Sequence, residues 1–229
     1  MKFCLLTVGL CLSTLTQAAT VYLDGLVPGV GSMHKEVVSI KERKFLNIVR
    51  QQTDFSCGAA SLATLLRYGY NIDTDEQKVM NGMFQVSDAT AARKLGFSML
   101  DIKNYVEQGL GMRVQGYNIP ADKLSALPIP TIVLLDIKGY RHFVVLKRVD
   151  KSGNVYIADP ALGNLTMSVE QFTQGWQGVV LAVVGQGYDQ SSPLAMPSPP
   201  LTVRSLEDQF APVTAFNLMD FGFNASELF

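Results

Sequence analysis

The stretch that decides the fold is residues 51–69, QQTDFSCGAASLATLLRYG, in a chain of 229 residues. Alanine and leucine dominate its second half, and both favour helices. The apolar side chains surround most of the helix instead of forming one stripe, which is typical of a helix buried on all sides. The stretch therefore predicts a central, buried helix over residues 55–68, with Ser56 or Asp54 as its N-cap.

Helical patterns continue for some distance after this helix, and strand patterns dominate the second half of the chain. Acidic residues before Val79 and Met80 predict a second helix, and the periodicity of residues 98–108 predicts a third. Apolar and β-branched runs predict strands at residues 131–135, 142–149, 155–158 and 179–184. Helices followed by antiparallel strands indicate an α+β domain, because βαβ folds alternate the two elements along the chain.

Residues 1–18 have the pattern of a secretory signal peptide. One cation, Lys2, precedes an apolar run of about ten residues, and the small residues Thr16 and Ala18 occupy the positions expected before a cleavage site. The run is too short to cross ~30 Å of hydrocarbon, which favours cleavage over a membrane anchor. We therefore expect a periplasmic or secreted protein with no membrane span after cleavage.

The remaining chain divides into three parts by composition. Residues 19–44 form an N-terminal segment with mixed loop and strand signals, and residues 45–184 contain the helices and strands of the domain. Residues 185–229 form a tail that is first rich in proline and then rich in phenylalanine. We expect the proline-rich part to be a linker or a surface wrap, and residues 216–229 to dock on the domain or on a partner.

Composition excludes several classes of protein. The net charge is −1, and no run of five or more Lys or Arg residues is present, so the basic surface of a nucleic-acid-binding protein is missing. Cleavage of the signal would remove two of the three cysteines and leave Cys57 alone. A single cysteine excludes an internal disulfide, and with only two histidines the chain lacks the ligands of a typical structural zinc site.

Cys57 and His142 are the residues best placed for nucleophilic chemistry. Cys57 starts the buried helix, where the helix dipole and free N–H groups are expected to lower the pKa of a thiol. His142 opens an apolar strand beside a glycine-containing loop, a suitable place for a general base. The alternatives are an ordinary buried cysteine and a capping or surface histidine. The other histidine, His34, has no comparable context.

Asp159 and Gln51 complete a candidate site. Asp159 ends the strand after that of His142 and could orient its imidazole, or it could simply begin an Asp-Pro turn. Gln51 lies six residues before Cys57, so its amide could join the Cys57 N–H in an oxyanion hole, or it could be a surface glutamine. If Asp150 faces Asn154 across a hairpin turn, Asp159 falls three residues short of the position opposite His142. A bulge at Gly153, strand twist or side-chain reach must close this gap.

Together these pieces resemble the C39 family of bacteriocin-processing, papain-like cysteine peptidases. The matching segments lie between residues 45 and 184 and are Gln51-x5-Cys57-Gly58-Ala59-Ala60, Leu62-Ala63, Tyr68-Gly69, His142-Phe143-Val144-Val145-Leu146 and Asp159-Pro160-Ala161-Leu162-Gly163. The resemblance implies a papain-like fold and a protein or peptide substrate. It also implies Cys57 as nucleophile, His142 as general base, Asp159 as orienting acid and Gln51 in the oxyanion hole, with no metal or organic cofactor.

The resemblance has limits that leave other functions open. Many family members are domains of ABC exporters that cut leader peptides after a double glycine, whereas this sequence shows an export signal and a proline-rich tail. Exported relatives of this type resemble accessory proteins of secretion or surface-pilus systems, so a component of such a system is an expected partner through the tail. An amidase or acyl transferase on the same scaffold, and a non-catalytic peptide-binding or assembly module, are the alternatives.

Overall fold

The computed structural model describes residues 19–23, 33–37, 39–137 and 139–195, and the chain divides into two compact units at Arg43. The first unit contains β1 (Ala19–Leu23) and β2 (Met33–Val37), which pair antiparallel. Helix α1 (Ile40–Lys44) ends where the second unit begins. The predicted signal peptide and most of the predicted tail lie outside the described residues.

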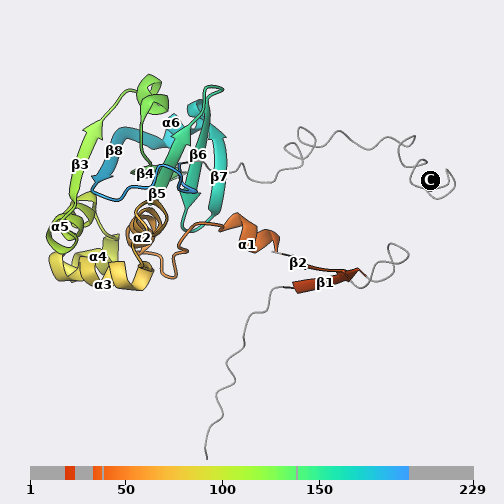
Figure 1. The fold of residues 1–229 in the computed structure, drawn as a ribbon. Coiled ribbons are helices and arrows are strands. Elements are labelled where there is room, and N and C mark those ends of the chain that lie inside the picture. The colour runs from red at the N-terminus through yellow and green to blue at the C-terminus, as the bar shows by residue number, and fades with distance from the viewer. Residues whose placement is uncertain (1–18, 24–32, 38, 138, 196–229) are drawn as a thin grey trace, which may run out of the picture. The chain divides into compact units, whose positions relative to one another are not determined.

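The second unit is built on one antiparallel sheet of six strands in the order β3-β8-β4-β5-β6-β7 (Figure 1). The strands are β3 (Arg113–Asn118), β4 (Thr131–Ile137), β5 (Tyr140–Val149), β6 (Asn154–Asp159), β7 (Gly163–Ser168) and β8 (Trp176–Val184). The four predicted strands correspond to β4, β5, β6 and β8 and are confirmed. The two edge strands, β3 and β7, were not predicted.

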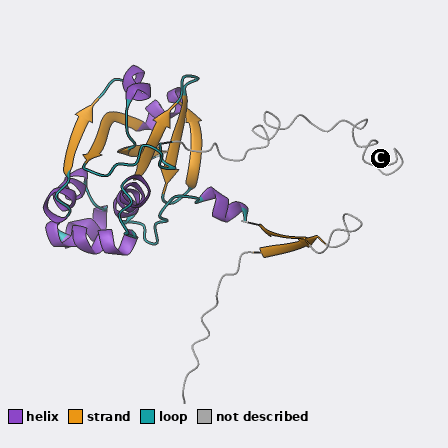
Figure 2. Cartoon of the chain, in the orientation of Figure 1, coloured by secondary structure: helices purple, strands orange, loops and turns teal. Residues whose placement is uncertain are grey.

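Helices surround this sheet, and the α+β prediction is confirmed (Figure 2). They are α2 (Cys57–Gly69), α3 (Glu76–Val86), α4 (Ala89–Leu95), α5 (Met99–Gly109), the 3-10 helix η1 (Ala121–Ala126) and α6 (Val169–Gly175). The three predicted helices correspond to α2, α3 and α5. Ser56 occupies the N-cap position of α2, as expected, but its side chain makes no capping hydrogen bond and contacts Glu76 and the Thr53 carbonyl instead.

Both faces of the sheet are buried, which explains the continuous apolar run in β5. Phe143 and Val145 belong to a core shared with α2, α3 and α5, whereas Val144 and Leu146 belong to a second core shared with α6 and η1. Alternate residues of a strand point to opposite faces, so a strand covered on both faces needs apolar residues at every position. Within the described ranges, no helix has the length and hydrophobicity needed to cross a bilayer.

The chain after β8 returns to the C-terminal end of α2. Asp189 donates its main-chain N–H to the Gly69 carbonyl at 2.9 Å, Tyr188 packs edge-on against Tyr70, and Leu194 is completely buried. The first eleven residues of the predicted tail, 185–195, therefore pack on the domain.

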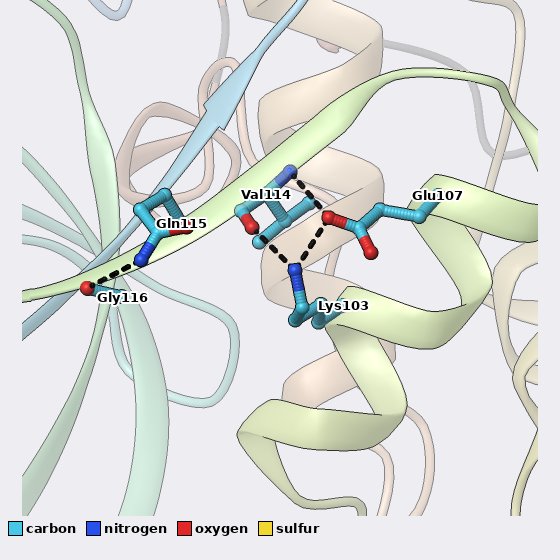
Figure 3. A network of polar contacts seen from close by, with 5 residues as sticks. All are labelled: Lys103, Glu107, Val114, Gln115 and Gly116. Carbon is cyan, nitrogen blue, oxygen red and sulfur yellow. Dashed lines mark hydrogen bonds and ion pairs between the residues drawn. The ribbon is translucent and has the colours of Figure 1, made fainter.

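Side chains of α5 cover part of the free edge of the sheet at β3 (Figure 3). Lys103 Nζ donates to the Val114 carbonyl at 2.9 Å, and Glu107 Oε1 accepts the Val114 N–H at 3.3 Å. Lys103 and Glu107 also form an ion pair of 2.5 Å. The two main-chain groups that Val114 would offer to another strand are thus already bonded.

Candidate active site

Helix α2 is attached to strand β5 at the residue that follows His142. Pairing between β5 and β6 ends at Val145 and Ala158, so Phe143 has no partner in β6. Its carbonyl instead accepts a hydrogen bond from Ser61 Oγ at 2.9 Å. Cys57 lies one helical turn before Ser61, and its thiol interacts with the Phe143 main chain. The local structure therefore places the first residue of α2 beside the start of β5.

The Cys57 thiol is buried, and this reverses one expectation from the sequence. Burial raises the pKa of the Cys57 thiol above its ordinary value, and the negative charge of Asp159 adds to this effect. Hydrogen bonds with the main chain of Phe143 and Gly58 lower the pKa but do not outweigh burial. The prediction that the helix N-terminus lowers the pKa of the Cys57 thiol is thus wrong for the resting enzyme. Desolvation destabilises the thiolate more than the N–H groups at the helix start stabilise it.

His142 and Asp159 form a buried pair. The distance from His142 Nε2 to Asp159 Oδ2 is 2.8 Å, and the side chains are 2% and 0% exposed. Asp159 Oδ1 accepts the main-chain N–H groups of Ala161 and Leu162 at 2.8 and 2.9 Å, which fixes the carboxylate. His142 Nδ1 is buried and has no partner among the described residues. A neutral imidazole that donates from Nε2 to Asp159 keeps the lone pair of Nδ1 free to accept a proton.

A β-bulge closes part of the gap between these two residues. The register of β5 and β6 shifts between Leu146 and Arg148, so Lys147 is the extra residue, and the bulge is not at Gly153. The shift brings Asp159 one residue closer to the position opposite His142. Residues that are diagonal neighbours across two strands are within reach of long side chains, which accounts for the remaining distance.

Gln51 is held near the turn that follows Asp159. Its main-chain N–H donates to the Pro160 carbonyl at 3.1 Å. Its side-chain oxygen, Oε1, is buried and has no partner in the part of the chain that the structure describes. The structure thus brings Gln51, by its main chain, to the His142–Asp159 pair. Across the described ranges, no hydrogen bond joins Cys57 to the His142 ring or to the Gln51 side chain.

Two residues of this region were missed from the sequence. The Tyr140 ring packs on the His142 ring with 5.0 Å between centroids, and strand alternation could have predicted this, since both residues lie on one face of β5. Glu76 is 4% exposed and accepts hydrogen bonds from the segment between Gln51 and Cys57. No local signal marks Glu76, because its contacts depend on how α3 packs beside α2.

A cavity of about 1210 Å³ opens at Cys57. It is lined mainly by residues 52–55 and 91–99 and, from the start of β5, by Tyr140, Arg141 and Phe143. Both signs of charge line it, from Arg93, Lys94, Arg141, Asp54, Asp88 and Asp101. The space is large enough for several residues of an extended peptide next to the thiol. In the described ranges, no three His, Cys, Asp or Glu side chains are arranged to bind a metal ion.

Comparison with known proteins gives a consistent result. The chain is 49% identical over its full length to the probable functional amyloid protease FapD of Pseudomonas aeruginosa, and the match covers all of that protein. It is also 49% identical to the protein of the same name from Pseudomonas fluorescens, over 89% of each chain. The crystal structure of a double glycine motif protease from an AMS/PCAT transporter, in complex with its leader peptide, is 28% identical and has a TM-score of 0.51. That match covers 61% of this chain and 91% of the other.

The family assignment follows from the region that contains the site. Residues 46–186 match the Peptidase C39 family, and this range includes α2 with Cys57, β5 with His142 and the turn after Asp159. The same range contains the six-stranded sheet and the helices that cover it. The chain therefore belongs to the C39 family and is a cysteine peptidase with that family's fold.

Proposed function

We propose that this peptidase is exported and processes protein components of a functional amyloid secretion system in the periplasm. The names of the two relatives at 49% identity support the amyloid system, and the signal-like pattern of residues 1–18 supports export. The predicted docking of the tail on a component of this system is part of the same proposal.

We further propose that Cys57, His142, Asp159 and Gln51 carry the reaction. The observation that carries this assignment is the His142–Asp159 hydrogen bond, which occupies Nε2 and leaves Nδ1 without a partner among the described residues. The next residue, Phe143, contacts Cys57 through its main chain. Cys57 Sγ attacks the carbonyl carbon of the scissile bond as Nδ1 accepts the thiol proton. The oxygen of the tetrahedral intermediate is stabilised by the Cys57 N–H and the Gln51 side-chain amide.

The second half of the reaction returns the protons. The imidazolium of His142 donates a proton to the leaving amine, and the C–N bond breaks to give a thioester on Cys57. Water then attacks the thioester, with His142 as base, and releases the new carboxylate and the thiol. Because burial raises the pKa of the Cys57 thiol, base catalysis by His142 is needed at neutral pH, when the resting thiol is protonated.

The catalytic assignment is tested with a library of fluorescence-quenched peptides and the protein lacking residues 1–18. We expect the wild type to cleave a subset of peptides, and Cys57→Ala and His142→Ala to lose activity by at least a thousandfold, roughly the range for members of a catalytic triad. Cleavage that survives Cys57→Ala would reject the nucleophile. If the wild type cleaves none of the peptides and none of the system's own proteins, the peptide-binding alternative is favoured.

Export is tested separately by fusing residues 1–23 to an alkaline phosphatase that lacks its own signal. Phosphatase activity in intact cells supports a periplasmic location, since this enzyme folds only where its disulfides form. A Leu5→Arg and Leu6→Arg double substitution in the apolar run is the matched control and should abolish the signal. Equal activity of both fusions, or none, would contradict export by this segment.

A further inference from the structure

The segment from Gln51 to Cys57, called here the oxyanion loop, is held by one buried carboxylate. Glu76, the first residue of α3, is 4% exposed. Its Oε1 atom accepts the main-chain N–H of Gln52 at 2.8 Å and the hydroxyl of Ser56 at 2.5 Å. These two donors lie at opposite ends of the loop, although they are close in space.

The positions of the two donors matter for the reaction. Gln52 directly follows Gln51, and Ser56 directly precedes Cys57. One oxygen atom thus links the neighbours of both proposed oxyanion donors. The residues between them form a turn that closes on itself, with Ser56 N donating to the Thr53 carbonyl at 3.3 Å. The loop has a second attachment at Gln51 N, which donates to Pro160.

A purely structural role in α3 does not explain this carboxylate. The N-cap of α3 is Asp75, whose side chain accepts the Lys78 N–H at 2.8 Å, so the helix start is already satisfied without Glu76. Burial of a carboxylate is costly unless hydrogen bonds replace its water. Here the replacing bonds come from the oxyanion loop and not from α3.

We propose that Glu76 is a positioning residue that sets the geometry of the oxyanion hole. It holds Gln51 and the Cys57 N–H at a fixed separation, so that both can donate to the oxygen that becomes negative in the transition state. Glu76 does not touch substrate and acts through the loop. This inference rests on the proposed function, in which Gln51 and the Cys57 N–H stabilise that oxygen.

The test compares Glu76→Ala, Glu76→Gln and Gln51→Ala, with Gln77→Ala, an exposed neighbour on α3, as the matched control. The measurements are kcat and KM for a peptide cleaved by the wild type, inhibition by the aldehyde of that peptide, the rate of Cys57 alkylation by iodoacetamide, and the melting temperature. The aldehyde forms a tetrahedral adduct that needs the oxyanion hole, whereas alkylation by iodoacetamide does not.

We expect Glu76→Ala to lower kcat and aldehyde affinity by roughly ten- to a hundredfold. This loss should not exceed the loss in Gln51→Ala. KM and the alkylation rate should stay within about twofold of the wild-type values. Glu76→Gln keeps an acceptor oxygen and should recover most of the loss. Gln77→Ala should match the wild type.

Three outcomes would overturn the inference. If Glu76→Ala keeps the wild-type kcat and aldehyde affinity while Gln51→Ala is impaired, the loop needs no support from Glu76. Equal losses in alkylation, kcat and thermal stability would assign Glu76 to folding alone. An unimpaired Gln51→Ala would reject the oxyanion assignment itself, and with it the proposal for Glu76.

Discussion

At the scale of single residues, the candidate site combines a buried thiol with a histidine whose Nδ1 has no partner among the described residues. Burial raises the pKa of Cys57, so alkylation by iodoacetamide should rise with pH at a higher midpoint in the folded protein than in the same protein in urea. Cys57 is the one cysteine after residue 18, so the measurement reports on a single atom. A folded midpoint below the unfolded one would instead indicate a preformed thiolate–imidazolium pair.

Asp159 is expected to set the tautomer of His142. Asp159→Asn keeps an oxygen for the N–H groups of Ala161 and Leu162, but it points an amide N–H₂ at Nε2. The ring must then accept at Nε2 and carry its proton on Nδ1, which can no longer take one from the thiol. We expect kcat to fall by roughly 10³–10⁴, with thermal stability close to wild type. A loss below tenfold would mean that Asp159 serves the turn and not the imidazole.

The residues of the candidate site could be named from the sequence, but the contacts that assemble them could not. Cys57, His142, Asp159 and Gln51 were named from helix and strand boundaries and from a family resemblance. The bulge at Lys147 and the hydrogen bonds of Glu76 depend on contacts between segments that the sequence does not place relative to one another. The direction of the Cys57 pKa was wrong because exposure at a helix end depends on what packs over it.

At the scale of elements, strands buried on both faces were easy to predict and edge elements were not. Strand β3 has one buried residue among six, Val114, so it shows no alternation. Helix α4 has one buried residue, Ala92, and therefore a weak helical periodicity. Strand β7 is only partly covered and is interrupted by polar residues. A sequence pattern reports burial, so elements with little burial leave little signal.

The turn between β6 and β7 requires glycine at position 163. Gly163 has a φ of +89°, and a Cβ there would lie 2.5 Å from the Lys44 carbonyl oxygen. Gly163→Ala should lower the free energy of unfolding by about 3 kcal/mol, measured by urea titration, from backbone strain and this clash together. Gly153→Ala is the control, with a φ of +80° and open space around the added Cβ, and should cost only about 1 kcal/mol. Equal losses would show that contact with Lys44 is unimportant.

The cover on β3 is expected to limit strand addition at this edge. The double variant Lys103→Ala, Glu107→Ala frees the main-chain N–H and carbonyl of Val114. We expect it to self-associate more than the wild type, as seen by light scattering at rising concentration. Lys123→Ala, which removes an exposed ion pair with its neighbour Asp122, is the control. Equal scattering by both variants would contradict a protective role.

At the scale of the whole molecule, the peptidase domain extends beyond its last strand. A chain that ends at Ala195 keeps the buried Leu194 and the Asp189–Gly69 hydrogen bond, whereas one that ends at Gly185 loses both. We expect the shorter chain to be less stable by about 2–4 kcal/mol, mainly from the lost burial of Leu194 and Tyr188. Thermal unfolding of the two chains measures this difference. Equal melting temperatures would place the boundary at β8.

The attachment of α2 to Phe143 joins two segments that lie far apart in the sequence. The proposed nucleophile lies near the beginning of the domain, and the proposed base and its carboxylate lie 85 and 102 positions later. A chain that is still emerging from the ribosome therefore contains the thiol without the groups proposed to activate it. Long-range contacts of this kind form late, because the intervening chain must first be ordered. The proposed catalytic groups can therefore come together only after the chain has been synthesised past Asp159 and has folded.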